Sequence, residues 1–258
     1  KEERERIKMA DQIASAADRV NFPEKDARGE QISAYWSRKI AVLAHPLAGT
    51  NVLLGNLGAA DPQEIQQVAK RVLNKVSAAA LDEKKQYICL WRLLPEFLAK
   101  EYDTVGLLFN LLPADTRQPD HPLVQHLSIT AALADALPQP ALLILSIGPV
   151  QEFIAQARRT LDLWMGSWLL SFLSWKAIEV LCYDFGPDVI IYPFIRGNPL
   201  CDWWLHRQGI PIDRAEPSLL TIASLPNKLV ALLPADKLSE AVEKTKNCLL
   251  YTSPSPRD

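Results

Sequence analysis

Residues 142–147, LLILSI, form a short apolar run that predicts a buried strand, because the run is too short for a helix. Gly148 and Pro149 end this run, and Pro149 suits the first position of a helix, where its missing N–H is not needed. From there apolar residues recur at helical spacing. They predict one helix whose apolar stripe consists of Val150, Phe153, Ile154, Ala157 and Leu161.

The pattern continues with a second helix and two further strands. Residues 165–182 are apolar nearly all round, which predicts a helix buried on more than one side. Residues 189–192 and 229–233 are rich in β-branched or large apolar side chains and predict strands, and residues 234–246 predict a helix. The resulting order, with a fourth strand added, would be a β-α-β-β-α-β ferredoxin-like unit.

The chain before Pro138 predicts helices only. Helical patterns cover residues 1–20, 61–76, 83–100 and 123–137, and Pro95 is expected to kink or split the third of them. The Pro138-Gln139-Pro140 segment is the best candidate for a domain boundary. The predicted fold class is therefore α+β, with an all-α domain at 1–138 and a ferredoxin-like domain at 139–247.

Composition and charge argue against several classes of protein. Of the 258 residues, 48% are hydrophobic and 22% are charged, as in ordinary globular proteins, and the net charge of −2 gives no nucleic-acid footprint. No apolar run reaches the roughly 18 residues that span a bilayer, and the start, KEERERIK, does not resemble a signal peptide. The four cysteines form no C-x-x-C pair, which argues against zinc and disulfides and favours the reducing cytoplasm.

The last residues, 248–258, read CLLYTSPSPRD. This peptide is what a transposon-end sequencing adapter encodes codon for codon, so we expect a translated adapter there, with a genuine Ser/Pro-rich tail as the alternative. The chain also lacks an initial Met, and we expect it to be a piece of a longer protein.

Three long segments of the sequence resemble a known protein family. The segments SIGPVQEFIAQARRT, DLWMGSWLLS and IYPFIRGNPLCDWWL resemble the large subunit of type III-B CRISPR effector complexes, a Cmr-type protein with polymerase- and cyclase-like palms. The resemblance covers residues 1–247. It implies that 1–138 is derived from an HD-type domain and that 139–247 is the first of two palm domains.

The resemblance also implies a function for the full-length protein. Such a subunit joins other effector subunits, a guide RNA and a target RNA in a cytoplasmic antiviral complex, without a membrane. After target-RNA binding it makes cyclic oligoadenylate from ATP, using a divalent metal. The present piece would supply scaffold and part of the nucleotide site.

The nucleotide-site candidates lie at the predicted strand-to-helix junction. Gly148, Pro149 and Gln151 occupy a place where free N–H groups can meet phosphates, and Arg158 follows on the same predicted helix. A single Gly with no following Lys matches no P-loop. The alternatives are a plain tight connection and, for Arg158, a solvated position or an ion pair with Asp162 or Glu152.

The metal-site candidates lie in the helical half. Aspartate and histidine are natural ligands of divalent metals, and the densest polar cluster contains Asp115, His121 and His126, near Arg117 and Asp120. Asp11, in a segment that resembles the one after the first metal motif of HD-type domains, is added by the resemblance. The alternative is structural: a loop fixed by Asp115 and Arg117, a packed His126 and a solvated Asp11.

Catalysis by this chain alone is uncertain. Nucleotidyl transfer by a cyclase-like palm needs adjacent carboxylates that hold two metals, and the chain contains no Gly-Gly-Asp-Asp. In the family these carboxylates belong to the second palm, so no catalytic residue is predicted here. Two alternatives stay open: an HD-type metal-dependent phosphohydrolase or nuclease, whose His-Asp pair is absent from this sequence, and a non-catalytic degenerate palm that acts as a scaffold.

Overall fold

The computed structural model describes residues 2–15, 42–44, 51–53, 67, 70–71, 73–74, 82–101, 114, 121–212 and 216–252. The chain divides into two compact units, residues 1–10 with 128–258, and residues 11–127. The predicted boundaries after residues 138 and 247 stay predictions. Among the described helices, none has the length and apolar character needed to cross a membrane.

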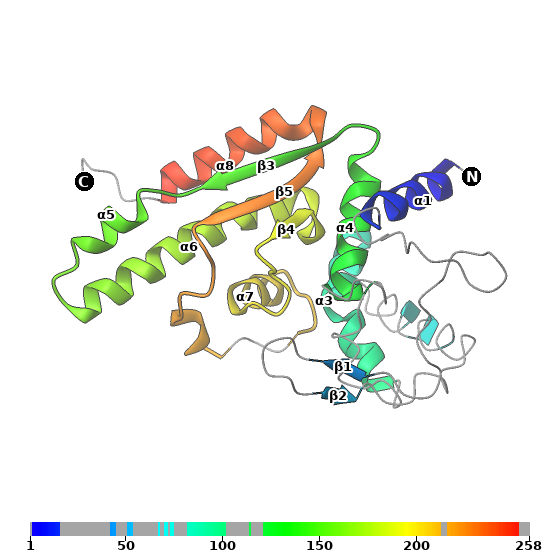
Figure 1. The fold of residues 1–258 in the computed structure, drawn as a ribbon, viewed down its shortest axis with the longest axis horizontal. Helices are drawn as coiled ribbons and strands as arrows, with labels where there is room; N and C mark the ends of the chain where they lie inside the picture. The colour runs from blue at the N-terminus through cyan, green and yellow to red at the C-terminus, as the bar shows by residue number, and fades with distance from the viewer. Residues whose placement is uncertain are drawn as a thin grey trace. The chain divides into compact units, whose positions relative to one another are not determined.

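The first unit is built on a three-stranded antiparallel sheet (Figure 1). Its strands are β3 (Pro140–Ser146), β4 (Ile190–Tyr192) and β5 (Lys228–Pro234), and β5 lies between the other two. The register pairs Ser146 with Lys228 and Ile144 with Val230. All three strands predicted from the apolar pattern are therefore confirmed.

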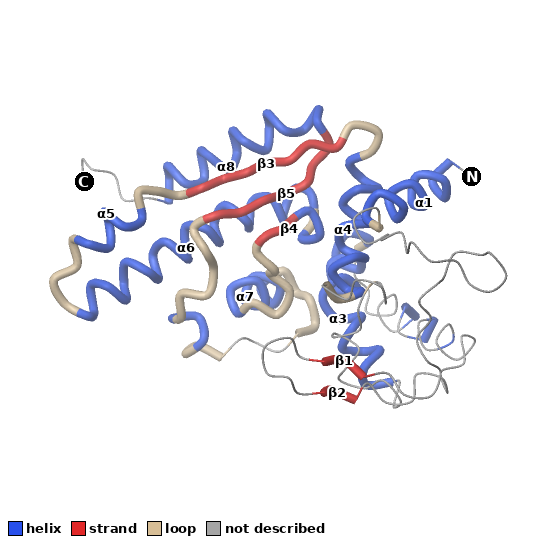
Figure 2. Tube along the Cα trace, in the orientation of Figure 1, coloured by secondary structure: helices blue, strands red, loops and turns tan. Residues whose placement is uncertain are grey.

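Helices cover one face of this sheet. The long helix α6 (Thr160–Phe185) and the helix α8 (Leu238–Thr252) lie side by side along it (Figure 2). Leu143 of β3 and Leu229 and Leu233 of β5 are buried, whereas Leu142 and Ile144 of β3 are 56% and 71% exposed. Because alternate residues of a strand point to opposite faces, the second face of the sheet is apolar and open.

The core of this unit lies around the middle of α6. Trp175, Ile178 and Leu181 are fully buried, as expected for a helix that is apolar nearly all round. Trp175 meets Trp204 edge to face, with ring centroids 6.3 Å apart. Trp204 lies on α7 (Pro199–Arg207), which the sequence analysis missed. Asn198 caps that helix by accepting the Leu200 N–H at 3.0 Å.

One helix prediction is wrong. Residues 150–161 do not form a single helix: α5 (Val150–Ala155) ends before a short connection, and α6 begins at Thr160. The cause is Asp162, whose Oδ2 accepts the backbone N–H groups of Arg158 at 3.3 Å and Arg159 at 3.1 Å. A carboxylate in the first turn that bonds the preceding amides starts a new helix. Arg158 consequently precedes α6 and is not on the helix of Val150.

The last helix is also longer than predicted. The segment from residue 234 begins with a 3₁₀ turn, Ala235–Lys237, and α8 then continues to Thr252. Cys248, at the start of the segment attributed to an adapter, lies on this helix with its Sγ 3.6 Å from the Lys176 carbonyl oxygen. The adapter origin of residues 248–258 stays a prediction.

The second unit contains the helix α3 (Glu83–Glu101) and a small hairpin of β1 (Val42–Ala44) and β2 (Asn51–Leu53). The expectation that everything before Pro138 is helical is therefore wrong. Apolar and β-branched residues flank the turn-forming segment HPLAGT, which is the composition of a hairpin. Pro95 lies inside α3 without splitting it.

Two helices contribute to both units. They are α1 (Glu2–Ala14), which begins the chain, and α4 (Leu123–Ala136), which precedes β3. Both were predicted from their helical pattern. The helix predicted at 61–76 falls mostly outside the described residues.

Candidate functional site

The strand-to-helix junction at Gly148 is held from the residue before it. The Ile147 N–H donates to the backbone oxygen of Asn227 at 2.8 Å, and Asn227 Nδ2 donates to the Ile147 oxygen at 2.8 Å. The chain then leaves the sheet through Gly148 and Pro149, and α5 starts at Val150. Asn227 therefore binds both polar backbone groups of the last residue before the junction.

The junction itself is open to solvent. Gly148, Pro149 and Gln151 are all exposed. A Cβ added at Gly148 would meet only the Val150 nitrogen, at 4.0 Å, which is ordinary van der Waals contact. The packing of the described residues does not demand glycine here, and the backbone at this point can be approached by another molecule.

Arg158 is not brought to this junction. It lies beyond the far end of α5, whose six residues span about 9 Å. The Arg158 side chain is exposed, and Asp162 contacts its backbone nitrogen and not its guanidinium. Among the described contacts, Arg158 forms no ion pair with Asp162 or Glu152, which was the alternative. Arg158 is an exposed cation that stands apart from Gly148.

Lys228 is a cation at this junction, and the apolar pattern of the sequence does not single it out. Lys228 is the register partner of Ser146, two residues before Gly148, and its side chain is exposed. Strand alternation puts it on the open face of the sheet, together with Ile144 and Val230. It forms no ion pair with any residue that the structure describes. The available signal was its position directly after Pro226-Asn227, at the start of a predicted strand.

The metal-site candidates are brought together only in part. Asp11 Oδ1 lies 3.1 Å from His126 Nε2, and the His121 and His126 rings stack with centroids 6.1 Å apart. His126 is 8% exposed, and its buried Nδ1 has no hydrogen-bond partner among the described residues. Asp115, Arg117 and Asp120 lie outside the described residues.

No complete metal site follows from this pair. Within the described ranges, no three His, Cys, Asp or Glu side chains gather in a way that suits a metal ion. Asp11 and His126 come from α1 and α4, which are far apart in sequence, and His121 adds a ring contact with His126. The arrangement provides a histidine–carboxylate pair and not a filled coordination set.

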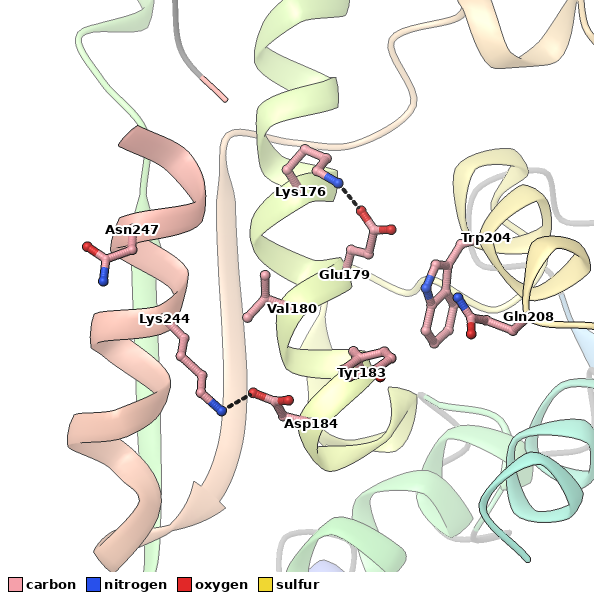
Figure 3. A pocket seen from close by; sticks show the side chains of 9 residues that line it. All are labelled: Lys176, Glu179, Val180, Tyr183, Asp184, Trp204, Gln208, Lys244 and Asn247. Atoms are coloured by element: carbon pink, nitrogen blue, oxygen red, sulfur yellow. Dashed lines mark hydrogen bonds and ion pairs between the residues drawn. The ribbon is translucent and has the colours of Figure 1, made fainter. Parts of the chain in front are cut away.

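A cavity of about 580 Å³ lies between α6, α7 and α8 (Figure 3). Its two lysines are already paired: Lys176 with Glu179, and Lys244 with Asp184 at 2.9 Å. The hydrogen bonds that Lys244 donates to Asp184 and then to Glu240 raise the pKa of Lys244, and the same contact with Lys244 lowers the pKa of the Glu240 carboxyl. With both cations neutralised, this cavity offers no anion site, in contrast to the surroundings of Lys228.

Comparisons with known proteins agree on one family. Residues 142–250 match the family described as "CRISPR-associated protein Cmr2, N-terminal". The chain is 28% identical over 288 residues to the CRISPR system Cmr subunit Cmr2 of Pyrococcus furiosus, covering 93% of this chain. It is 28% identical over 208 residues to the corresponding subunit of Saccharolobus solfataricus, covering 77% of this chain. These matches confirm the resemblance to the large subunit of type III-B CRISPR complexes that was inferred from the three sequence segments.

A solved structure shares the fold. A chain in the cryo-EM structure of the type III-B Cmr-beta complex bound to cognate target RNA matches with a TM-score of 0.67, at 22% identity, over 95% of this chain. The matched proteins are much longer. The present chain spans 32% of the Pyrococcus subunit, 19% of the Saccharolobus subunit and 28% of the cryo-EM chain.

Proposed function

We propose that this chain, which belongs to the Cmr2 family of type III-B CRISPR large subunits, supplies scaffold and one half of a nucleotide site to its effector complex. The observation that carries the proposal is the open sheet face that ends at Gly148 and Lys228. An exposed backbone turn beside a lysine that has no ion pair among the described residues suits the phosphates of a nucleotide.

The topology supports a palm-like domain. The element order is strand, two helices, strand, the helix α7, strand, helix. With α7 as an insertion between β4 and β5, this order and the antiparallel arrangement β3-β5-β4 correspond to a ferredoxin-like unit without its fourth strand. In such a unit the helices cover one face and leave the other for ligands or partners. The exposed Ile144 and Tyr192 give that face an apolar and aromatic surface on which a base can lie.

The reaction proposed for the full-length subunit is synthesis of cyclic oligoadenylate from ATP after target-RNA binding. The divalent metal of such a reaction requires adjacent carboxylates, and the junction offers one acidic residue, Glu152. One carboxylate does not hold a pair of metal ions, so we place no metal at this junction. In the present chain, Lys228 would bind and neutralise phosphate charge, and Gly148 would leave room for it.

The proposed partners follow from the matched complex. That assembly is a Cmr complex bound to cognate target RNA. We therefore expect other effector subunits, a guide RNA and a target RNA to be the macromolecular partners of this chain, in the cytoplasm. ATP is the proposed small-molecule ligand.

The test uses the full-length subunit assembled with its partners and guide RNA. Lys228→Ala is expected to weaken ATP binding about tenfold by titration calorimetry, because a charge-assisted contact contributes roughly 1.5–3 kcal/mol. Gly148→Val is expected to weaken ATP binding while the thermal midpoint stays near that of the wild type. Lys244→Ala removes an exposed lysine on α8 whose charge is already paired with Asp184 and Glu240, and is the control. Unchanged ATP affinity in the first two variants would support the degenerate-palm scaffold instead.

A second candidate function rests on the Asp11–His126 contact. A buried histidine whose Nδ1 lacks a partner in the described structure, paired with a carboxylate, suits part of a metal-dependent phosphohydrolase or nuclease site. Asp115 and His121 would complete it. The full-length subunit with Mn²⁺ should then cut single-stranded nucleic acid, and His126→Ala should abolish Mn²⁺ binding. Equal Mn²⁺ binding by both proteins would exclude these residues as ligands.

A further inference from the structure

We infer that Asn227 is a positioning residue for the nucleotide-facing junction, acting through Ile147. This inference rests on the proposed function, since it concerns the same junction. Neither the apolar pattern nor the resemblance assigns Asn227 any role. It lies 80 residues from Ile147 in sequence, and its role follows from the contacts that it makes in the fold.

Ile147 forms two hydrogen bonds with Asn227. The β3–β5 register ends at Ser146 and Lys228, and Ile147 and Asn227 are the next residues along each strand. The Ile147 N–H donates to the Asn227 backbone oxygen, and the side-chain Nδ2 of Asn227 donates to the Ile147 oxygen, each at 2.8 Å. The side chain thus adds a hydrogen bond beyond the ladder. Gly148 then begins from a residue whose two backbone groups are both bound.

The segment that leads to Asn227 is itself held by α6. Trp168 Nε1 donates to the Leu220 oxygen at 2.9 Å. Ser171 Oγ, buried on the same helix, accepts the N–H groups of Ser224 at 3.1 Å and Leu225 at 2.9 Å. These contacts connect the rigid core helix to Asn227.

These contacts have a consequence for ligand binding. Asn227 directly precedes Lys228, so one residue determines the position of both the cation and the turn at Gly148. The Asn227 side-chain amide donates to the Ile147 carbonyl, which lies just beyond the last register pair of the two strands. Without it, the Ile147 carbonyl loses its side-chain partner and the junction gains freedom to move away from Lys228.

The experiment uses the assembled full-length complex and ATP as the probe. Asn227→Ala is expected to weaken ATP affinity roughly five- to tenfold, the effect of one part-buried hydrogen bond, and to raise hydrogen exchange of the peptide containing Gly148. Asn227→Gln keeps the amide but displaces it, and should give an intermediate loss. It also serves as the second variant if the alanine protein does not assemble. Asn247→Ala, an exposed asparagine on α8, is the matched control and should bind ATP as the wild type does.

The outcomes separate the inference from the proposed function. If Asn227→Ala lowers the thermal midpoint but binds ATP with wild-type affinity, Asn227 only closes a strand end and the inference is wrong. If Gly148→Val and Lys228→Ala also leave ATP affinity unchanged, the nucleotide site is not at this junction and the proposed function fails as well. Weakened binding in Lys228→Ala without any effect in Asn227→Ala or Asn227→Gln overturns the positioning role alone.

Discussion

Gly166 on α6 lies so close to Phe153 on α5 that a Cβ added at Gly166 would be 3.3 Å from Phe153 Cε1. This contact brings the short helix α5 against the start of α6. Asp162, one turn earlier on α6, holds the connection between the two helices by accepting the Arg158 and Arg159 amides. The direction of α5, and with it the place of Gln151, therefore depends on two residues of the next helix.

The Gly166–Phe153 contact predicts an energetic coupling between the two residues. Alanine in a helix is more favourable than glycine by roughly 0.5–1 kcal/mol, but here the added methyl must displace the ring. Gly166→Ala should be neutral or destabilising in the wild type and stabilising when Phe153 is replaced by Ala. A double-mutant cycle from urea unfolding should yield a coupling of at least about 0.5 kcal/mol. Additive effects would mean that Phe153 moves aside without cost.

The buried hydroxyl of Ser171 leads to a second prediction. Its Oγ accepts two backbone amides, from Ser224 and Leu225, and it is 1% exposed. Ser171→Ala leaves both donors without this acceptor, and unsatisfied buried groups cost about 1–3 kcal/mol each. We expect the free energy of unfolding to fall by roughly 2 kcal/mol or more.

Ser174 is the matched control for this measurement. It is equally buried on the same helix, but its Oγ donates to the Leu170 oxygen within the helix. Ser174→Ala should cost less than about 1 kcal/mol, since alanine favours the helix and no amide is orphaned. Equal losses in the two variants would show that the segment before Asn227 is not held by Ser171.

The sequence predicted the central sheet well because its strands are short apolar runs between clear breakers, such as Gly148-Pro149 and Gly186-Pro187. It failed where one specific polar side chain determined the outcome. Asp162 ended the helix from Val150 by bonding two amides, a local effect that apolar periodicity does not register. Asn227 and Lys228 were missed because their importance comes from register with Ile147 and Ser146, and one sequence does not reveal strand pairing.

The metal candidates illustrate the same limit. The sequence placed His126 in a polar cluster with Asp115 as a candidate metal ligand, whereas the carboxylate that the structure places against His126 is Asp11, from the first helix. This pairing depends on how α1 packs against α4. The rings of His121 and His126 stack, while Asp115 falls outside the described residues.

The Asp11–His126 pair gives a third prediction. Asp11→Ala removes the partner of a nearly buried imidazole nitrogen, and the thermal midpoint should fall by an amount equivalent to about 1 kcal/mol. Asp11→Asn retains an oxygen at the same position and should preserve most of the stability in EDTA. If Asp11→Asn is as unstable as Asp11→Ala, the carboxylate charge and not the hydrogen bond stabilises His126.

Because the thiol of Cys182 is buried, we expect the free energy of unfolding to fall as the pH rises into the alkaline range. Cys182 is fully buried on α6, and burial, followed by the nearby Cys201 and Asp188, raises its pKa well above the ordinary value. The unfolded thiol titrates near pH 8.5, whereas the folded thiol keeps its proton at that pH. Below about pH 8.5 both states hold the proton and the stability contribution is complete. Above it, only the unfolded chain releases the proton, so unfolding becomes easier by up to about 1.4 kcal/mol per pH unit.

The measurement for Cys182 is the free energy of unfolding in urea at several pH values between about 7.5 and 10. Cys182→Ala should lose this part of the alkaline slope, whatever its stability at pH 7.5, because other titrating groups contribute equally to both proteins. Cys248→Ala, at a half-buried position on α8, is the matched cysteine-to-alanine control. Native Cys182 should also resist alkylation by iodoacetamide at pH 8.5, since thiolate is the reactive form. An identical slope in Cys182→Ala and wild type, or rapid alkylation of native Cys182, would show that the thiol ionises in the folded protein.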